Sequence, residues 1–94
     1  MSQNFNQQKP KGRKQVNGAI ETIFAYMEDR TRIEITVSNM RNVLFTGIIR
    51  GFDEWMNLVI DQAIEINTKT EKQNLLGRIM LKGDTICFIR QLDQ

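Results

Sequence analysis

GFDEWMNLVID, residues 51–61, is the stretch that decides the fold, because in it a turn runs directly into a strand. Gly51 accepts most backbone conformations, and the carboxylate of a turn aspartate such as Asp53 can accept hydrogen bonds from backbone N–H groups two residues further on. Trp55 is an unusual residue at the mouth of a strand, since a small polar residue would complete the turn equally well. The apolar side chains then alternate with polar ones and are expected on one strand face: Met56, Leu58, Ile60, Ile64 and Ile66. The stretch therefore predicts a turn that carries a surface site.

A short amphipathic helix is expected ahead of the strands. Its buried stripe should consist of residues that recur with the spacing of one helical face, Ile20, Ile23, Phe24 and Met27. Asn17 is the predicted N-cap, and the helix should end near Asp29 and Arg30. A helix this short needs something to pack on.

The apolar period changes to two after Arg32, where Ile33, Ile35 and Val37 alternate with polar residues. Further strands are predicted over residues 43–52, 56–66, 75–82 and 85–92, with connections at 38–42, 67–74 and 83–84. Gly47 and Gly51 favour bends or bulges in the second strand, and the last two strands carry apolar residues on both faces. The pattern predicts a mostly β fold, in which an N-terminal helix precedes a strongly bent, five-stranded antiparallel sheet that forms a small, partly open barrel.

Charge and composition divide the chain into a tail and one folded domain. Residues 1–15 contain four of the 13 basic residues, none of the 11 acidic residues, and only one bulky apolar residue, Phe5. Such a segment cannot bury enough apolar surface to offset its ordering, so we expect a disordered basic tail over 1–15 and a single domain over 16–94. The absence of a secretory signal and of any apolar run near about 20 residues indicates an intracellular protein.

Catalysis is not expected from these residues. The chain has no histidine, which removes the commonest general base and metal ligand. Cys87 lies in the middle of a predicted strand and is interpreted as a small core residue, while the adjacent carboxylates of Asp53 and Glu54 should point apart. We therefore predict no catalytic residue, no metal site and no cofactor.

Two predicted turns carry groups that suit a single-stranded nucleic acid. The ring of Trp55 could stack on a base and the amide of Asn57 could bond to its edge, while Lys82 beside Gly83 could meet a phosphate or cover the base. Structural roles are equally compatible with the pattern: Trp55 in the core or an interface, Asn57 closing its own turn, and Lys82 as a charge on an edge strand. Composition alone does not decide between these interpretations.

Two segments resemble the two sequence motifs of the Sm protein family. Residues 47–60, GIIRGFDEWMNLVI, resemble the first motif, residues 79–84, IMLKGD, resemble the second, and the resemblance extends over about residues 17–92. It implies the Sm fold, an SH3-like barrel, assembled into a heteroheptameric ring around the uridine-rich site of a spliceosomal snRNA. It also implies that Trp55 stacks on a base, Asn57 reads the uracil edge, Lys82 and Gly83 form the opposing clamp, and Asp53 braces the loop.

The same resemblance implies partners and a location. The other ring subunits would be Sm F, Sm G and a Sm D-class protein, without a membrane or a small-molecule substrate, and the protein would be nuclear with a cytoplasmic assembly phase. Trp55 stands where Tyr or Phe is more usual in the family, and Lys82 where most members have Arg. Two alternatives stay open: a like-Sm ring that serves RNA decay or chaperoning, and an SH3-type module that binds peptides. The form Lys82-Gly83-Asp84 favours the splicing ring.

Overall fold

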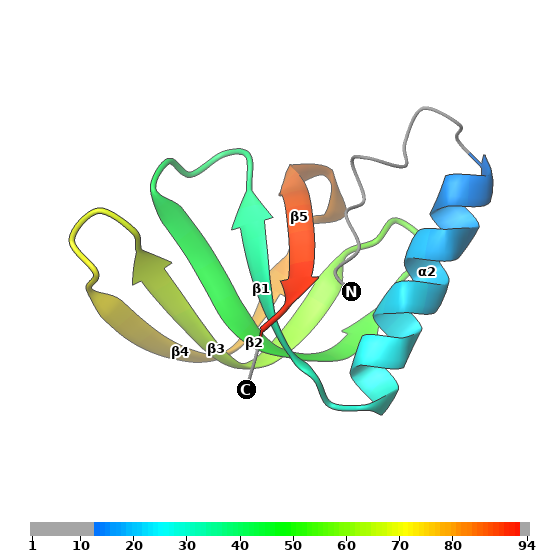
Figure 1. Cartoon of the computed structure of the whole chain (residues 1–94), viewed down its shortest axis with the longest axis horizontal. Coiled ribbons are helices and arrows are strands. Elements are labelled where there is room, and N and C mark those ends of the chain that lie inside the picture. Colours follow the sequence, from blue (N-terminus) through cyan, green and yellow to red (C-terminus); the bar gives the residue numbers. More distant parts are fainter. Residues whose placement is uncertain (1–12, 93–94) are drawn as a thin grey trace.

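The computed structural model describes residues 13–92, with side chains from Ile20 onward, and shows one helix packed on one antiparallel sheet (Figure 1). The elements are α2 (Arg13–Glu28), β1 (Arg32–Val37), β2 (Val43–Phe52), β3 (Leu58–Asn67), β4 (Gln73–Leu81), the 3₁₀ turn η2 (Gly83–Thr85) and β5 (Ile86–Gln91). The five strands have the order β4-β3-β2-β1-β5, so that β4 and β5 are the two edges. The mostly β fold with an N-terminal helix is confirmed.

The start of the helix differs from the prediction. Helix α2 begins at Arg13, four residues before Asn17, so the N-cap prediction is wrong. Arg, Lys and Gln have high helix propensity, which explains why the residues ahead of Asn17 extend the helix. Residues 1–12 lie outside the described residues, so for them the disordered tail that we expect over 1–15 stays a prediction. The helix ends at Glu28, close to the predicted end.

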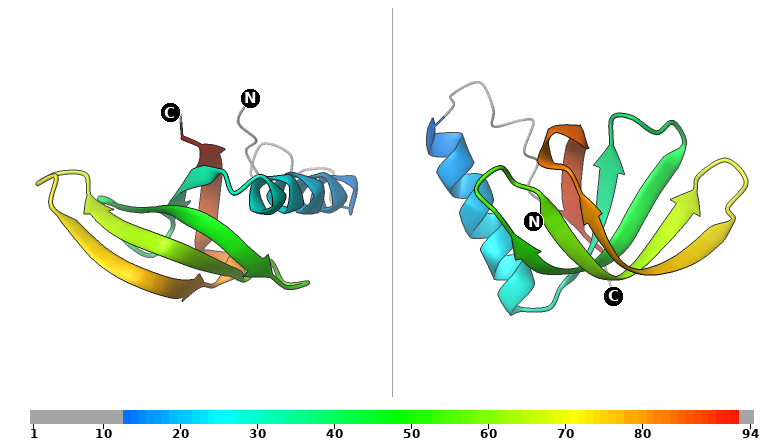
Figure 2. Two further views of the ribbon diagram at one scale, coloured as in Figure 1. Left: turned by 90° about the horizontal axis from the view of Figure 1, so that it is seen from below. Right: turned by 180° about the vertical axis from the view of Figure 1, so that it is seen from behind.

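Helix α2 lies across one end of the sheet, and the β3–β4 turn lies at the other (Figures 1 and 2). Ile23 and Tyr26 are buried against the sheet, and Met27 packs beside them. Phe24, predicted on the buried stripe, is 47% exposed instead. The buried face is rotated toward Tyr26, whose large ring follows Ile23 by three residues and therefore shares its side of the helix.

The core lies between the helix and the concave side of the bent sheet. Strand β1 alternates as predicted, with Ile33, Ile35 and Val37 buried and its polar residues less buried. The complete buried apolar cluster among the described residues is Ile23, Tyr26, Ile33, Ile35, Val37, Phe45, Ile49, Leu58, Ile60, Ala63 and Ile89.

Strand β2 bends sharply at Gly47, where its register with β3 shifts between Thr46 and Ile48. A Cβ atom at Gly47 would clash with the Cγ2 of Ile60 and lie 2.8 Å from the carbonyl oxygen of Asp61. The predicted irregularity at Gly47 is therefore present, and it brings the backbones of β2 and β3 close together. A second register shift lies between Ile49 and Gly51, but a Cβ at Gly51 would meet nothing within 4 Å.

Strand β3 contains a bulge that the alternation did not predict. Gln62 has φ of 52°, in the left-handed region, and the register between β3 and β4 shifts between Ile60 and Ala63. One extra residue moves every following side chain to the other face, so Ala63 rather than Gln62 enters the core. The prediction that Ile64 and Ile66 continue the buried face of Ile60 is wrong; both are half-buried and line an open groove.

We expect Gly47→Ala to destabilise the fold by about 1–3 kcal/mol, because the added methyl group forces strand β3 away from the bend. The melting temperature should fall by about 4–8 °C for each kcal/mol in a domain of this size. Gly51→Ala is the matched control in the same strand, and its melting temperature should change little. Thermal unfolding followed by circular dichroism, with both variants at one protein concentration, makes the comparison. Equal effects at the two positions would show that the bend at Gly47 does not depend on the missing side chain.

Candidate nucleic-acid interface

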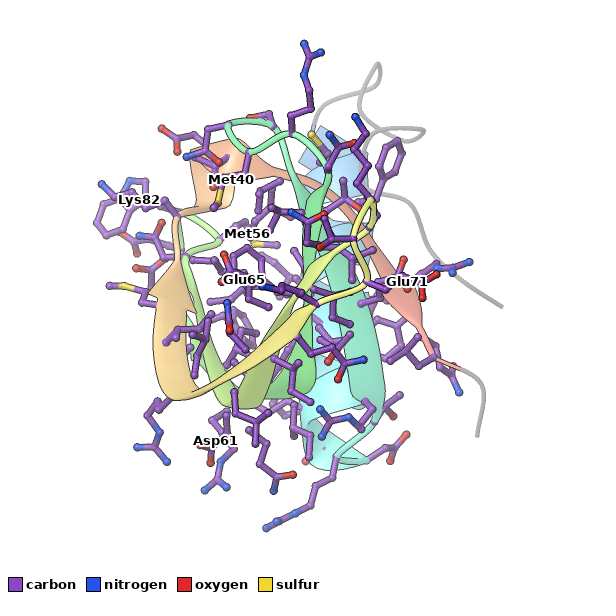
Figure 3. All side chains as sticks on the ribbon, turned by 90° about the vertical axis from the view of Figure 1, so that its left-hand side faces the viewer. Met40, Met56, Asp61, Glu65, Glu71 and Lys82 are labelled. Atoms are coloured by element: carbon purple, nitrogen blue, oxygen red, sulfur yellow. The ribbon has the colours of Figure 1, made fainter. Side chains whose placement is uncertain are left out.

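The pairing of β3 with β4 brings the two predicted site turns to one rim of the sheet. Leu58, the first residue of β3, pairs with Leu81, the last residue of β4. The preceding turn at 53–57 and the following residues 82–85 therefore adjoin at the same end of this antiparallel ladder. Figure 3 shows Met56 and Lys82 toward one end of the molecule and Asp61 at the opposite end.

A hydrogen bond joins the two turns directly. The backbone N–H of Gly83 donates to Oδ1 of Asn57 over 2.8 Å. The backbones also touch, since a Cβ at Gly83 would clash with the carbonyl oxygen of Trp55 and lie 2.8 Å from the carbonyl group of Met56. The structure thus brings together all four residues expected to bind RNA: Trp55, Asn57, Lys82 and Gly83.

The carboxylate of Asp53 organises the first of these turns. Its Oδ1 accepts from the backbone N–H groups of Trp55 (2.9 Å) and Asn57 (3.0 Å), and its Oδ2 accepts from Nδ2 of Asn57 (2.9 Å). The turn also places Met56 in the left-handed region, with φ of 65°. The side-chain bond from Asn57, supported by the backbone N–H bonds, lowers the pKa of the Asp53 carboxyl below its ordinary value because these donors stabilise the charged form.

Two neighbours determine the orientation of the Asn57 amide. The N–H of Gly83 can only donate and the ionised carboxylate of Asp53 can only accept, so Oδ1 must face Gly83 and Nδ2 must face Asp53. One N–H and one lone pair of the amide are not used by these two bonds. Asn57 therefore closes its own turn, bridges to the second turn, and keeps a donor and an acceptor for a ligand.

Trp55 and Lys82 supply the exposed surface of this rim. Trp55 is 70% exposed, so the interpretation of Trp55 as a core residue is wrong. Lys82 is also exposed, and the salt bridges found where side chains are described, from Ile20 to Leu92, do not involve it. Its carbonyl oxygen accepts from the N–H and Oγ1 of Thr85 (3.0 and 2.7 Å), which holds the backbone of the second turn. An aromatic plane and a cation are thus available beside the amide of Asn57.

Within residues 13–92, no three His, Cys, Asp or Glu side chains gather as a metal site would require, and no helix is long and apolar enough to cross a membrane. Cys87, expected in the core, is half-buried in β5.

Comparison with known proteins identifies related chains. The family described as "LSM domain" matches residues 25–91. The probable small nuclear ribonucleoprotein E of Caenorhabditis elegans is 44% identical over 75 residues, which cover 80% of this chain and 83% of the relative. The corresponding Drosophila melanogaster protein is 42% identical over 83 residues, or 88% of each chain. The motif combination at residues 51–57 and 77–84 also resembles this member, Sm E, and the comparison confirms that resemblance.

Solved structures share the fold. A heptameric archaeal Sm protein matches with a TM-score of 0.67 at 20% identity, covering 78% of this chain and 98% of the archaeal chain. A Sm-like protein of Archaeoglobus fulgidus matches with a TM-score of 0.66 at 23% identity, covering 78% and 92%. At these identities the likeness supports the fold alone.

We expect Asp53→Asn to release the side chain of Asn57, because the new amide would turn one N–H₂ group toward another. Glu54→Gln removes the same charge from the same turn, where the Glu54 side chain is exposed, and should change nothing. The side-chain amide signal of Asn57 in ¹⁵N NMR spectra reports the difference. In the parent chain the bonds persist above the ordinary pKa of aspartate and should be lost only as pH falls through the lowered pKa of Asp53. An Asn57 signal that moves equally in both variants would contradict this role.

Proposed function

The chain belongs to the LSM domain (Sm) family, and on that basis we propose that it is a non-catalytic subunit of a heteroheptameric Sm ring that binds the uridine-rich site of spliceosomal snRNA. The observation that carries the RNA-binding part is the rim itself, in which the Asn57–Gly83 hydrogen bond holds an exposed Trp55 and Lys82 on adjoining turns. The relatives named small nuclear ribonucleoprotein E support the choice of a splicing ring.

A uracil base fits the chemistry of this rim. Its flat face would stack on the indole of Trp55, which buries apolar surface without selecting a base. Its edge presents carbonyl acceptors beside an N–H donor, and the unused N–H and lone pair of Asn57 complement such a pair. Lys82 would meet the adjacent phosphate or cover the base. Because Gly83 has no side chain, the two turns can lie in contact. Selectivity for uridine would therefore come from Asn57 and affinity from Trp55 and Lys82.

The two edges of the sheet support assembly with other chains. Neither β4 nor β5 has a second neighbour within residues 13–92, so each presents an unpaired row of backbone groups. Leu75 and Met80 on β4 and Phe88 on β5 are exposed large apolar residues. Pairing of β4 with the β5 of a neighbour is a head-to-tail contact, and such contacts close into a ring when the rotation between subunits allows it. Sm F, Sm G and a Sm D-class protein are the proposed neighbours.

The proposed location is the nucleus, with a cytoplasmic phase of ring assembly. A like-Sm ring for RNA decay or chaperoning is the second candidate, since the family match alone fits both kinds of ring. The snRNA bound by the purified ring decides between them: spliceosomal snRNA supports the first, and its absence supports the second.

We expect Trp55→Ala and Asn57→Ala to leave the ring assembled but to weaken its binding of oligouridine. Loss of stacking costs about 1–3 kcal/mol per base, or roughly 5- to 150-fold in affinity. Part of this loss would be masked in the ring, because the other subunits also bind the RNA. Phe24→Ala removes another exposed aromatic residue outside the rim and is the control. Trp55 is the single tryptophan of the chain, so oligouridine should also quench its fluorescence when the other subunits lack tryptophan or carry a substitute for it.

The salt dependence of binding and the mapping of crosslinks complete this experiment. Lys82→Ala should lower the slope of log affinity against log salt by about 0.7, the value of one phosphate on a single strand, whereas Lys69→Ala in the exposed β3–β4 turn should not. Crosslinks from oligouridine, mapped by mass spectrometry, should fall on the turns at 53–57 and 82–85. Crosslinks that avoid both turns, together with normal binding by Trp55→Ala, would refute the site.

Expressed alone, the chain should aggregate or self-associate because both sheet edges are open and apolar. Coexpression with Sm F and Sm G should give a soluble complex of defined mass by native mass spectrometry. A monodisperse monomer at micromolar concentration, with no complex on coexpression, would contradict the proposed ring.

A further inference from the structure

An open groove with a volume of about 730 Å³ separates the β3–β4 hairpin from the start of β1 and the residue that follows β5. Its apolar wall includes Ile64 and Ile66 of β3 and Leu75 of β4. Leu75 is 81% exposed, and both isoleucines are only half-buried. The wall adjoins the outer edge of β4, which has no strand partner among the described residues. A surface of this kind gains stability when another chain covers it.

Arg32 lies in the same groove, and neutral groups hold its guanidinium there. Nη2 donates to the carbonyl oxygen of Gln62 (3.1 Å) and to Oγ1 of Thr46 (3.5 Å), and Nη1 donates to Oε1 of Gln62 (3.3 Å). The β3 bulge makes this possible, because Gln62 is not a register partner in the ladder with β2 or in the ladder with β4. Its carbonyl group is therefore available to the arginine.

Several arginines of the sheet bind other side chains, and among them Arg32 alone has no carboxylate partner in the described part of the chain. Arg50 and Arg78 share the carboxylate of Asp61, at 3.5 and 3.2 Å, and Arg90 pairs with Glu34 at 3.2 Å. None of the salt bridges found among the described side chains, residues 20–92, includes Arg32. A guanidinium has five N–H donors, and the three bonds above leave donors for a carboxylate.

We propose that this groove receives a strand segment of a different polypeptide, which places an apolar side chain against Leu75 and an Asp or Glu carboxylate on Arg32. This inference rests on the proposed function, since it describes the contact that one ring neighbour makes. The neutral bonds to Gln62 and Thr46 hold the guanidinium in place, so a carboxylate would pair with a cation that is already ordered. The apolar wall would exclude water from that pair and strengthen it.

A second copy of this chain fits the groove poorly. Its free edge strand β5, ICFIRQ, contains Arg90 and no acidic residue. Docked on β4, this strand would offer no carboxylate of its own to Arg32, and the side chain of Arg90 already pairs with Glu34. The groove would therefore favour a neighbour with an acidic residue in its edge strand over a second copy, which can still associate through the apolar strand edges when no such neighbour is present.

Zero-length crosslinking tests the proposal on the complex coexpressed with Sm F and Sm G and, separately, with a Sm D-class protein. Arg32→Lys keeps the charge and introduces an amine that a carbodiimide couples to a carboxylate in direct contact. We expect a crosslink from position 32 to an Asp or Glu of another subunit, identified by mass spectrometry. A crosslink only within this chain, a crosslink to a second copy, or none in assembled complexes would overturn the inference.

Charge reversal supplies the affinity measurement. Arg32→Glu should weaken the complex with the neighbour at least about tenfold, because it places two carboxylates together, whereas Arg41→Glu in the exposed β1–β2 turn should stay within about twofold. Circular dichroism of both variants shows whether the fold persists, and Arg32→Gln, which retains donors for Gln62, covers the case where charge reversal prevents folding. If rings assemble equally well with every variant, the groove proposal fails and the proposed function stands. If no complex forms with the parent chain, both fail.

Discussion

The hydrogen bond between the N–H of Gly83 and Oδ1 of Asn57 is the contact on which the candidate site depends. It spans 26 residues of sequence and joins two turns that would otherwise be separate features of the rim. The bond requires three conditions: Leu58 paired with Leu81, an amide oriented by Asp53, and no side chain at position 83. The first is a property of the whole sheet and the others are local, so the site is produced by the fold and the turn sequence together.

The bend of the sheet creates a second surface away from this rim. Gly47 lets β2 approach β3 closely, and the bulge at Gln62 shifts the side chains that follow it. As a result Ile64 and Ile66 leave the core and line a groove with Arg32. Under the proposed function, the rim would bind RNA while the groove and the free strand edges would contact neighbouring chains.

Much of the fold could be predicted from sequence because its signals are local. The alternation of Ile33, Ile35 and Val37 predicts strand β1, and glycine at position 47 predicts a bend. The bulge at Gln62 could not be predicted, since a glutamine in the left-handed region leaves no compositional signal. The same holds for Phe24 and Tyr26, because helical spacing alone does not decide which neighbouring stripe the sheet will cover.

The residues of the candidate site could be proposed from the sequence, but their geometry could not. The motif resemblance indicates Trp55, Asn57, Lys82 and Gly83, while the amide bridge depends on strand register, which the sequence does not display. That bridge can be tested most directly with a double-mutant cycle of Asn57→Ala and Gly83→Ala, measured as the oligouridine affinity of assembled rings. If one bridge makes the two turns a single site, the double variant should be little weaker than either single variant, with a coupling of about 0.5–3 kcal/mol. Losses that simply add would contradict the account, because they would show that the two turns bind RNA independently.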